Sequence, residues 1–291
     1  MKQLLFFFIT FIFPAITFSQ ISFQMGPRQT VKNETLDNGV LRVFYETKSV
    51  RDATKPEMTD ADFLVLEIGE KGISRYYSDN RRRTDSIMNE LMKGGGPVRF
   101  DQNTLSNSGI TSAGDSKEIF KNYPSGKITV TDRIANSDYL YEEDRINFQW
   151  QIESETREIL SYTCQKAVTD FRGRHYEAWF APDLPINDGP WKFSGLPGLI
   201  LTVEDSDKNF IFYAVGIENF NRPVEYPKKD YVKTSRTEVA KIQKRFIEDP
   251  MGYISNSNPG ARVMIRTVDR TTGEERTGSD VKIPYNPIEL E

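Results

Sequence analysis

Residues 186–200 read Ile186-Asn187-Asp188-Gly189-Pro190-Trp191-Lys192-Phe193-Ser194-Gly195-Leu196-Pro197-Gly198-Leu199-Ile200, a run of glycine, proline and large apolar residues that specifies backbone shape and an apolar surface. The segment from Leu196 to Leu199 predicts a type II turn, because proline pre-sets φ at the second position and glycine accepts the positive φ of the third. Trp191 and Phe193 stand upstream as apolar anchors. Two interpretations remain open: a buried crossover between strands, or an apolar lip at a ligand cavity. The glycine spacing fits neither a dinucleotide site nor a P-loop.

Several stretches of the chain resemble one family. Residues 195–200 spell the signature of the GLPGLI family of secreted proteins, and the likeness extends to residues 160–167, 178–182 and 184–186. The closing segment from Tyr285 to Leu290 also resembles the C-terminus of that family. The resemblance covers roughly residues 157–215 and the tail, and it implies a secreted protein without pointing to a particular activity.

The first 19 residues have the layout of a signal peptide. Lys2 is followed by an apolar run over residues 4–16, and the segment closes with Thr17-Phe18-Ser19, so cleavage is expected before Gln20. The apolar run is shorter than the ~20 residues of a transmembrane helix. Because Gln20 is not a cysteine, a lipid anchor is not expected. We therefore predict a periplasmic protein with one β-rich domain over residues 20–291.

Composition excludes several functional classes. The net charge of −4 disfavours nucleic-acid binding, and the basic cluster at residues 81–83 is diluted by acidic neighbours, which indicates a solvated face. Cys164 is the only cysteine, so no intramolecular disulfide forms. His175 is the only histidine, and a metal site needs about three or four such ligands. No metal, cofactor or catalytic residue is predicted, although a contact between Cys164 and His175 on adjacent strands would allow thiol chemistry.

Period-two patterns dominate the chain and predict strands. They lie over residues 40–50, 63–68, 73–77, 146–152, 158–171, 175–182, 199–204, 210–217 and 261–268. In residues 210–217 both alternating sets are apolar, which predicts a strand covered on both faces. Residues 97–125 are rich in Gly, Ser, Asn and Asp and predict an irregular loop.

Two segments have helical periodicity. Residues 84–92 form an amphipathic pattern, and Ser235 to Glu238 is a capping box followed by apolar residues at helical spacing up to Phe246. Together with the strands, they predict a mainly β protein (a β-rich α+β fold) with one curved antiparallel sheet or half-open barrel and one or two packed helices. By analogy of strand order this architecture resembles the LolA-type carriers, an analogy of fold that carries no function.

Three hypotheses of function follow. The first is a non-enzymatic binding or carrier protein for an apolar small molecule or lipid, because ligand pockets are mostly apolar. Its candidate ligand-binding residues are Trp191, Phe193, Leu196, Pro197, Gly198, Leu199 and Phe212. The second is an interaction module for an envelope protein such as an outer-membrane transporter, through residues 97–125 or strand addition at a sheet edge. The third is an enzyme that depends on Cys164 and His175.

Overall fold

The structure is a computed structural model that describes residues 20–21, 31–93, 107, 112–135, 137–257, 265–268, 275–277 and 284–290. The predicted signal peptide, residues 261–264 of a predicted strand and most of the first half of the loop predicted over residues 97–125 lie outside the described residues. Within the described part, no helix is both long and apolar enough to cross a membrane.

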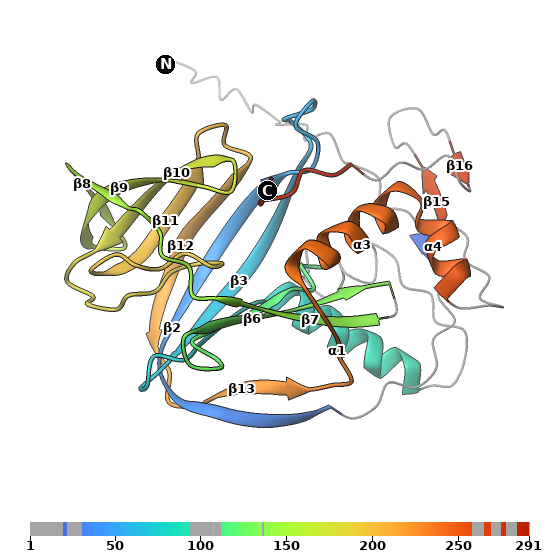
Figure 1. Ribbon diagram of the computed structural model, residues 1–291, viewed down its shortest axis with the longest axis horizontal. Helices are drawn as coiled ribbons and strands as arrows, with labels where there is room; N and C mark the ends of the chain where they lie inside the picture. Colours follow the sequence, from blue (N-terminus) through green and yellow to red (C-terminus); the bar gives the residue numbers. More distant parts are fainter. Residues whose placement is uncertain are drawn as a thin grey trace, which may run out of the picture.

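One large open sheet dominates the fold (Figure 1). Its strand order is β14-β7-β6-β5-β4-β3-β2-β12-β11-β10-β9-β8. Outside this order, β13 pairs with the first part of β2, residues 32–38. All neighbours are antiparallel except β14 and β7. The prediction of a mainly β protein with a curved sheet is confirmed, and the sheet does not close into a barrel.

The strands are β1 (Gln20–Ile21), β2 (Lys32–Val50), β3 (Thr59–Gly69), β4 (Ser74–Ser78), β5 (Glu118–Lys121), β6 (Lys127–Ile134), β7 (Ser137–Asp144), β8 (Gln151–Ile159), β9 (Tyr162–Phe171), β10 (Arg174–Ala181), β11 (Leu199–Asp205), β12 (Phe210–Asn219), β13 (Pro223–Lys228), β14 (Val232–Thr234), β15 (Ile265–Val268) and β16 (Glu275–Thr277).

Local turn chemistry explains the strands that the sequence predicted. The hairpin of β3 and β4 turns at Gly72, whose φ is 75°, and that of β9 and β10 turns at Arg172 and Gly173, with φ of 44° and 77°. Glycine reaches this left-handed region without the steric cost that a Cβ imposes. These turns therefore fix the registers of both hairpins.

Three strand predictions differ from the structure. Residues 158–171 do not form one strand, because Leu160 and Ser161 take φ of 50° and 66° and make a hairpin between β8 and β9. Residues 146–150 are not in a strand. The loop predicted over residues 97–125 contains β5, which pairs with β4 and β6. Pairing with two neighbours makes β5 a strand despite its weak local pattern.

The helices border the two faces of the strands β6 and β7 (Figure 1). They are α1 (Asp79–Lys93), α3 (Arg236–Glu248) and α4 (Pro250–Ser257). Ser235 caps α3 as predicted, since its hydroxyl accepts a hydrogen bond from the Glu238 amide at 3.3 Å. Val239 of α3 packs into the core, whereas α1 lies on the opposite face.

The core fills the concave side of the sheet. It consists of inward-facing strand residues together with side chains of the two crossing segments, residues 145–150 and 182–198. The protein's own chain therefore covers this face. The prediction that β12 is covered on both faces is wrong, because Tyr213 keeps 44% of its surface exposed while Phe212 and Ala214 are buried.

Candidate functional site

The residues predicted to bind an apolar ligand lie mostly inside the filled core. Phe193 is fully buried, and its ring centroid lies 5.0 Å from that of Trp191, 4.9 Å from Tyr176 and 6.1 Å from Phe212. Leu196, Gly198 and Leu199 are also buried, whereas Pro197 is exposed. The structure thus brings Trp191, Phe193 and Phe212 together, but their rings contact one another and neighbouring core side chains.

The turn in this segment differs from the predicted type II turn. Gly195, not Gly198, has a positive φ, of 101°. Gly198 is needed for space, because a Cβ at this position would lie 2.2 Å from the carbonyl oxygen of Ala181. The segment is thus pressed against the end of β10, as expected for the buried-crossover interpretation.

Buried charges hold the same segment on the sheet. Lys192 Nζ lies 2.5 Å from carboxylate oxygens of both Glu143 and Glu289, and it donates to the Tyr141 hydroxyl at 3.1 Å. Asp188 forms an ion pair with Lys121 of β5, and burial lowers the pKa of Lys121 despite that carboxylate. A crossover fixed by two buried ion pairs is anchored at defined points of the sheet.

Cys164 and His175 are far apart. His175 pairs with Asp170 across the hairpin, and Cys164 lies six residues further along β9, about 20 Å away at ~3.3 Å per residue. Cys164 is fully buried, and burial raises the pKa of its thiol to about 11. His175 Nδ1 instead lies 2.8 Å from Asp170. The geometry does not bring thiol and imidazole together. Among the described residues, no group of three or more His, Cys, Asp and Glu side chains is placed to hold a metal ion.

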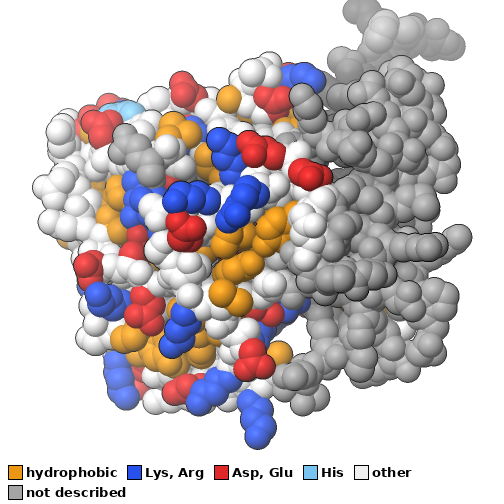
Figure 2. All heavy atoms as spheres, turned by 45° about the vertical axis from the view of Figure 1, so that its right-hand side comes forward, with side chains coloured by type: hydrophobic (Ala, Val, Ile, Leu, Met, Phe, Trp, Pro, Cys, Tyr) orange, Lys and Arg blue, Asp and Glu red, His pale blue; other side chains and the backbone are white. Residues whose placement is uncertain are grey.

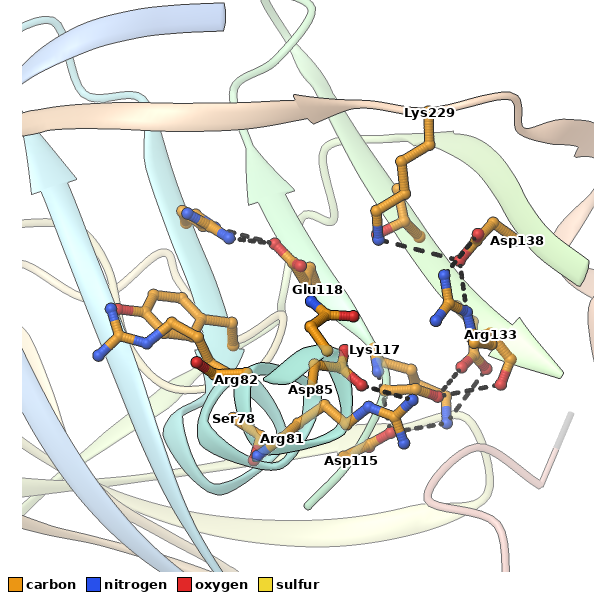
Figure 3. A pocket seen from close by; sticks show the side chains of 17 residues that line it. Ser78, Arg81, Arg82, Asp85, Asp115, Lys117, Glu118, Arg133, Asp138 and Lys229 are labelled. Carbon is orange, nitrogen blue, oxygen red and sulfur yellow. Dashed lines mark hydrogen bonds and ion pairs between the residues drawn. The ribbon is translucent and has the colours of Figure 1, made fainter. Parts of the chain in front are cut away.

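A polar pocket lies on the other side of the sheet from the core (Figure 3). It has a volume of about 260 Å³ and is bordered by α1, by β4 to β7 and by Lys229 between β13 and β14. Side chains alternate along strands, so the core residues Tyr76 and Ile119 point away from it while Tyr77 and Glu118 line it. The pocket is rich in both acidic and basic side chains.

Two planar ion pairs face this pocket. Arg75 donates from Nε and Nη2 to the same oxygen of Glu118, at 2.9 and 2.7 Å. Arg133 donates to both oxygens of Asp138, at 3.0 and 2.7 Å. Each guanidinium is less than one-fifth exposed. Such paired geometry fixes both partners before any ligand arrives.

A third cluster joins the entry of β5 to β6. Lys117 Nζ lies 3.4 Å from carboxylate oxygens of both Asp115 and Asp132. Burial alone would lower the pKa of Lys117, but these carboxylates outweigh it and raise the pKa. Burial raises the pKa of Asp132, against the effect of Lys117. On α1, Arg81 is 3.2 Å from Asp85, so part of the basic cluster at residues 81–83 lines the pocket.

Charges of both signs also mix on the surface of the molecule. On the face in Figure 2, Lys and Arg side chains are interspersed with Asp and Glu, and small apolar patches lie between them. The sequence analysis did not identify the pocket, because its pairs join residues far apart, such as Arg75 and Glu118. Arg133 and Asp138 are close in sequence, and a correctly predicted hairpin of β6 and β7 would place them opposite each other.

Comparisons with known proteins show a likeness of fold. A family model described as "N-glycanase peptide, N-terminal domain" matches residues 115–242. The solved structure titled "Structure of PNGF-II in P21 space group" is 12% identical, with a TM-score of 0.50, over 72% of this chain and 34% of that chain. The structure of PNGF-II in the C2 space group is also 12% identical, with a TM-score of 0.48, over 72% and 33% of the two chains. This chain therefore spans about a third of the length of those proteins, and no curated protein matches it.

Proposed function

We propose that this protein is a secreted binding module that holds a carbohydrate in the polar pocket. The observation that carries the proposal is the pair of planar ion pairs, Arg75 with Glu118 and Arg133 with Asp138, on one wall of a 260 Å³ pocket. Each pair presents N–H donors beside carboxylate acceptors. Adjacent sugar hydroxyls need this combination, because one hydroxyl donates while its neighbour accepts.

The charge balance of the pocket favours a neutral, hydroxyl-rich ligand. A phosphate or sulfate would meet the carboxylates of Asp85, Glu118 and Asp138 as well as the cations. An apolar ligand would leave these charges without water, at a cost of several kcal/mol for each. A neutral hydroxyl can donate to the carboxylates and accept from the guanidinium groups, and hydrogen bonds to charged groups contribute ~1.5–3 kcal/mol each.

The size of the pocket and the family match support the same class of ligand. A volume of 260 Å³ is just below the ~300–1,000 Å³ of pockets for drug-sized ligands, which suits one or two sugar units. The matched family model is named for an N-glycanase, a name that concerns glycans. The part of this chain that it matches, residues 115–242, includes the pocket residues Glu118, Arg133 and Asp138.

Binding of sugars to the purified protein tests the proposal. A glycan array identifies the ligand, and calorimetry then compares the wild type with Asp138→Asn, which keeps the shape of the side chain and removes its charge. We expect affinity to fall at least tenfold, about 1.4 kcal/mol. Asp144→Asn is the matched control, because Asp144 lies on the same strand and pairs with Lys127 outside the pocket. Equal affinity of wild type and Asp138→Asn for every bound glycan would refute the proposal.

The earlier ligand and partner hypotheses stay predictions. An apolar ligand at Trp191, Phe193, Leu196 and Leu199 would have to displace core side chains, and native mass spectrometry of protein from its own envelope would detect it. In the main order of the large sheet, as far as the structure describes it, a strand-adding partner such as an outer-membrane transporter would meet β8 or β14 at the ends. In β8 a register shift between Ile152 and Thr156, with Glu153 and Glu155 within it, opposes such pairing.

Membership of the GLPGLI family and export to the periplasm are also part of the proposal. They rest on residues 195–200 and on the layout of residues 1–19. The intact mass of protein recovered from the periplasm tests the second point, since cleavage before Gln20 predicts a chain that begins at that residue.

A further inference from the structure

The C-terminal segment, residues 284–290, is bound to the sheet as a peptide would be. It has no helix or strand, and one of its backbone bonds runs from the Leu290 amide to the Arg172 carbonyl at 3.1 Å. Its other contacts come largely from side chains. Asn286 Nδ2 donates to the Val50 carbonyl at 3.0 Å, and Ile288 packs against the core.

Arg174 of β10 recognises the backbone of this segment. Its guanidinium donates to Asn286 Oδ1 at 2.8 Å, to the Pro287 carbonyl at 2.8 Å and to the Ile288 carbonyl at 3.2 Å. The Tyr176 hydroxyl donates to the same Ile288 carbonyl at 3.1 Å. A planar fork of donors fixes the path of an extended chain.

Three cations surround the Glu289 carboxylate. Lys192 Nζ lies 2.5 Å away, Arg172 Nη1 2.7 Å and Arg236 Nη1 3.1 Å. Burial by itself would raise the pKa of Glu289, but these cations outweigh it and lower the pKa. The socket, formed by Arg172, Arg174, Tyr176, Lys192 and Arg236, therefore selects a carboxylate at this position of the segment.

The socket has a support that does not depend on the tail. Arg174 also pairs with Asp205 of β11 at 2.8 Å, and both side chains are at most 5% exposed. Arg172 and Lys192 also pair with Glu143 of β7, each at 2.5 Å. Arg172, Arg174 and Lys192 each keep a sheet carboxylate when Glu289 leaves, so this part of the site is pre-organised for an incoming peptide.

We infer that these residues form a peptide-binding site, occupied in cis by the protein's own tail, that takes an extended peptide of the pattern Asn-Pro-aliphatic-Glu in trans. The inference is independent of carbohydrate binding, because the socket and the polar pocket are built from different residues. The tail competes with a free peptide as a tethered ligand, whose effective concentration is in the mM range for a short tether.

A labelled peptide tests the inference. The peptide has the sequence of residues 283–291 with fluorescein at its N-terminus, and fluorescence anisotropy follows its binding to the full-length chain. In one variant, Asn286→Ala with Glu289→Ala loosens the tail. We expect saturable binding to this variant, at least tenfold tighter than to the wild type, and loss of binding when Arg174→Lys is added.

Matched controls separate recognition from general stickiness. A peptide carrying the two alanine changes should not bind. Arg157→Lys in the loosened variant should leave binding unchanged, because Arg157 belongs to β8, which is separated from β10 by β9, and its guanidinium lies over the Trp179 ring, 4.1 Å from the centroid. Absence of saturable binding to a folded loosened variant, or equal binding of the altered peptide, overturns the inference.

Hydrogen exchange on the wild type covers the case in which the loosened variant does not fold. The Leu290 amide should exchange by local release of the tail, at least tenfold faster than hydrogen-bonded amides at the β10 and β11 pairing. If it exchanges as slowly as those amides, the tail separates only on global unfolding and no socket opens.

Discussion

Gly198→Ala should destabilise the protein by about 3 kcal/mol. The added Cβ would lie 2.2 Å from the Ala181 carbonyl oxygen, 2.6 Å from its carbon and 3.0 Å from Pro182 Cα. All three are backbone atoms, so no side chain can rotate away. Overpacking of this kind costs ~1–3 kcal/mol. A shift of the Ala181 carbonyl also weakens the hydrogen bond that it accepts from the Leu184 amide, which adds about 1 kcal/mol.

Thermal unfolding followed by circular dichroism measures the effect. A change of 3 kcal/mol lowers Tm by roughly 6–12 °C for a protein of this size class. Gly216→Ala in β12 is the control, because its Cβ would have one neighbour, Phe44 Cδ2, at 3.4 Å, an ordinary contact. We expect the control to stay within about 1 kcal/mol of the wild type.

The result also distinguishes the two interpretations of residues 195–200. An exposed lip at a ligand cavity could relax around one methyl group, so Gly198→Ala would change ligand binding and leave stability almost intact. A buried crossover cannot relax, because Leu199 is paired with Ala181 in the register of β10 and β11. A Gly198→Ala variant as stable as Gly216→Ala would refute the packing argument.

Three further predictions concern buried charges and the thiol. Lys192→Met should destabilise the protein by about 3–5 kcal/mol in urea unfolding, because Glu143 and Glu289 lose a buried cation; an effect below 1 kcal/mol would contradict this. The folded pKa of Glu289 lies below its ordinary 4.5, so its contribution to stability is complete above pH 4.5 and is lost as the pH falls through the folded value. The stability difference between wild type and Glu289→Gln should therefore shrink between pH 6 and 3, and a difference that stays constant would argue against the ion pairs. Cys164, buried and with a pKa of about 11, should react with a thiol reagent at pH 8 only after denaturation; labelling of the native protein within minutes would show that the thiol is accessible.

The sequence predicted those elements whose signals are local. The strands on either side of Gly72 and the cap at Ser235 depend on residues within a few positions of each other, and these predictions are confirmed. The turn at Leu160 and Ser161 was missed because two non-glycine residues take a positive φ there, which no propensity predicts. The prediction of a positive φ at Gly198 is wrong for a related reason. Glycine is needed there because the backbone of Ala181, at the end of β10, lies too close for a Cβ.

The polar pocket was beyond local prediction for a physical reason. Its acidic and basic residues meet only when β4, β5, β6 and β7 are aligned in register, and each of them is an ordinary charged residue in the sequence. In contrast, the segment around Trp191 has an unusual composition, because glycine, proline and large apolar residues are concentrated in it. This composition serves packing. The aromatic side chains fill the concave face of the sheet, and glycine lets the backbone approach the sheet closely.

Two parts of the chain covered by the resemblance to the GLPGLI family, residues 157–215 and the closing segment, meet in space. Lys192 lies three residues before Gly195 and Glu289 belongs to the closing segment, and their charged groups are 2.5 Å apart with Glu143 beside them. This contact gives both parts a structural role, because Lys192 is a buried cation shared by two carboxylates, one on the sheet and one on the closing segment. A resemblance carried by such residues therefore reports on the fold. The proposed carbohydrate site lies elsewhere, on the pocket wall formed by Arg75, Glu118, Arg133 and Asp138.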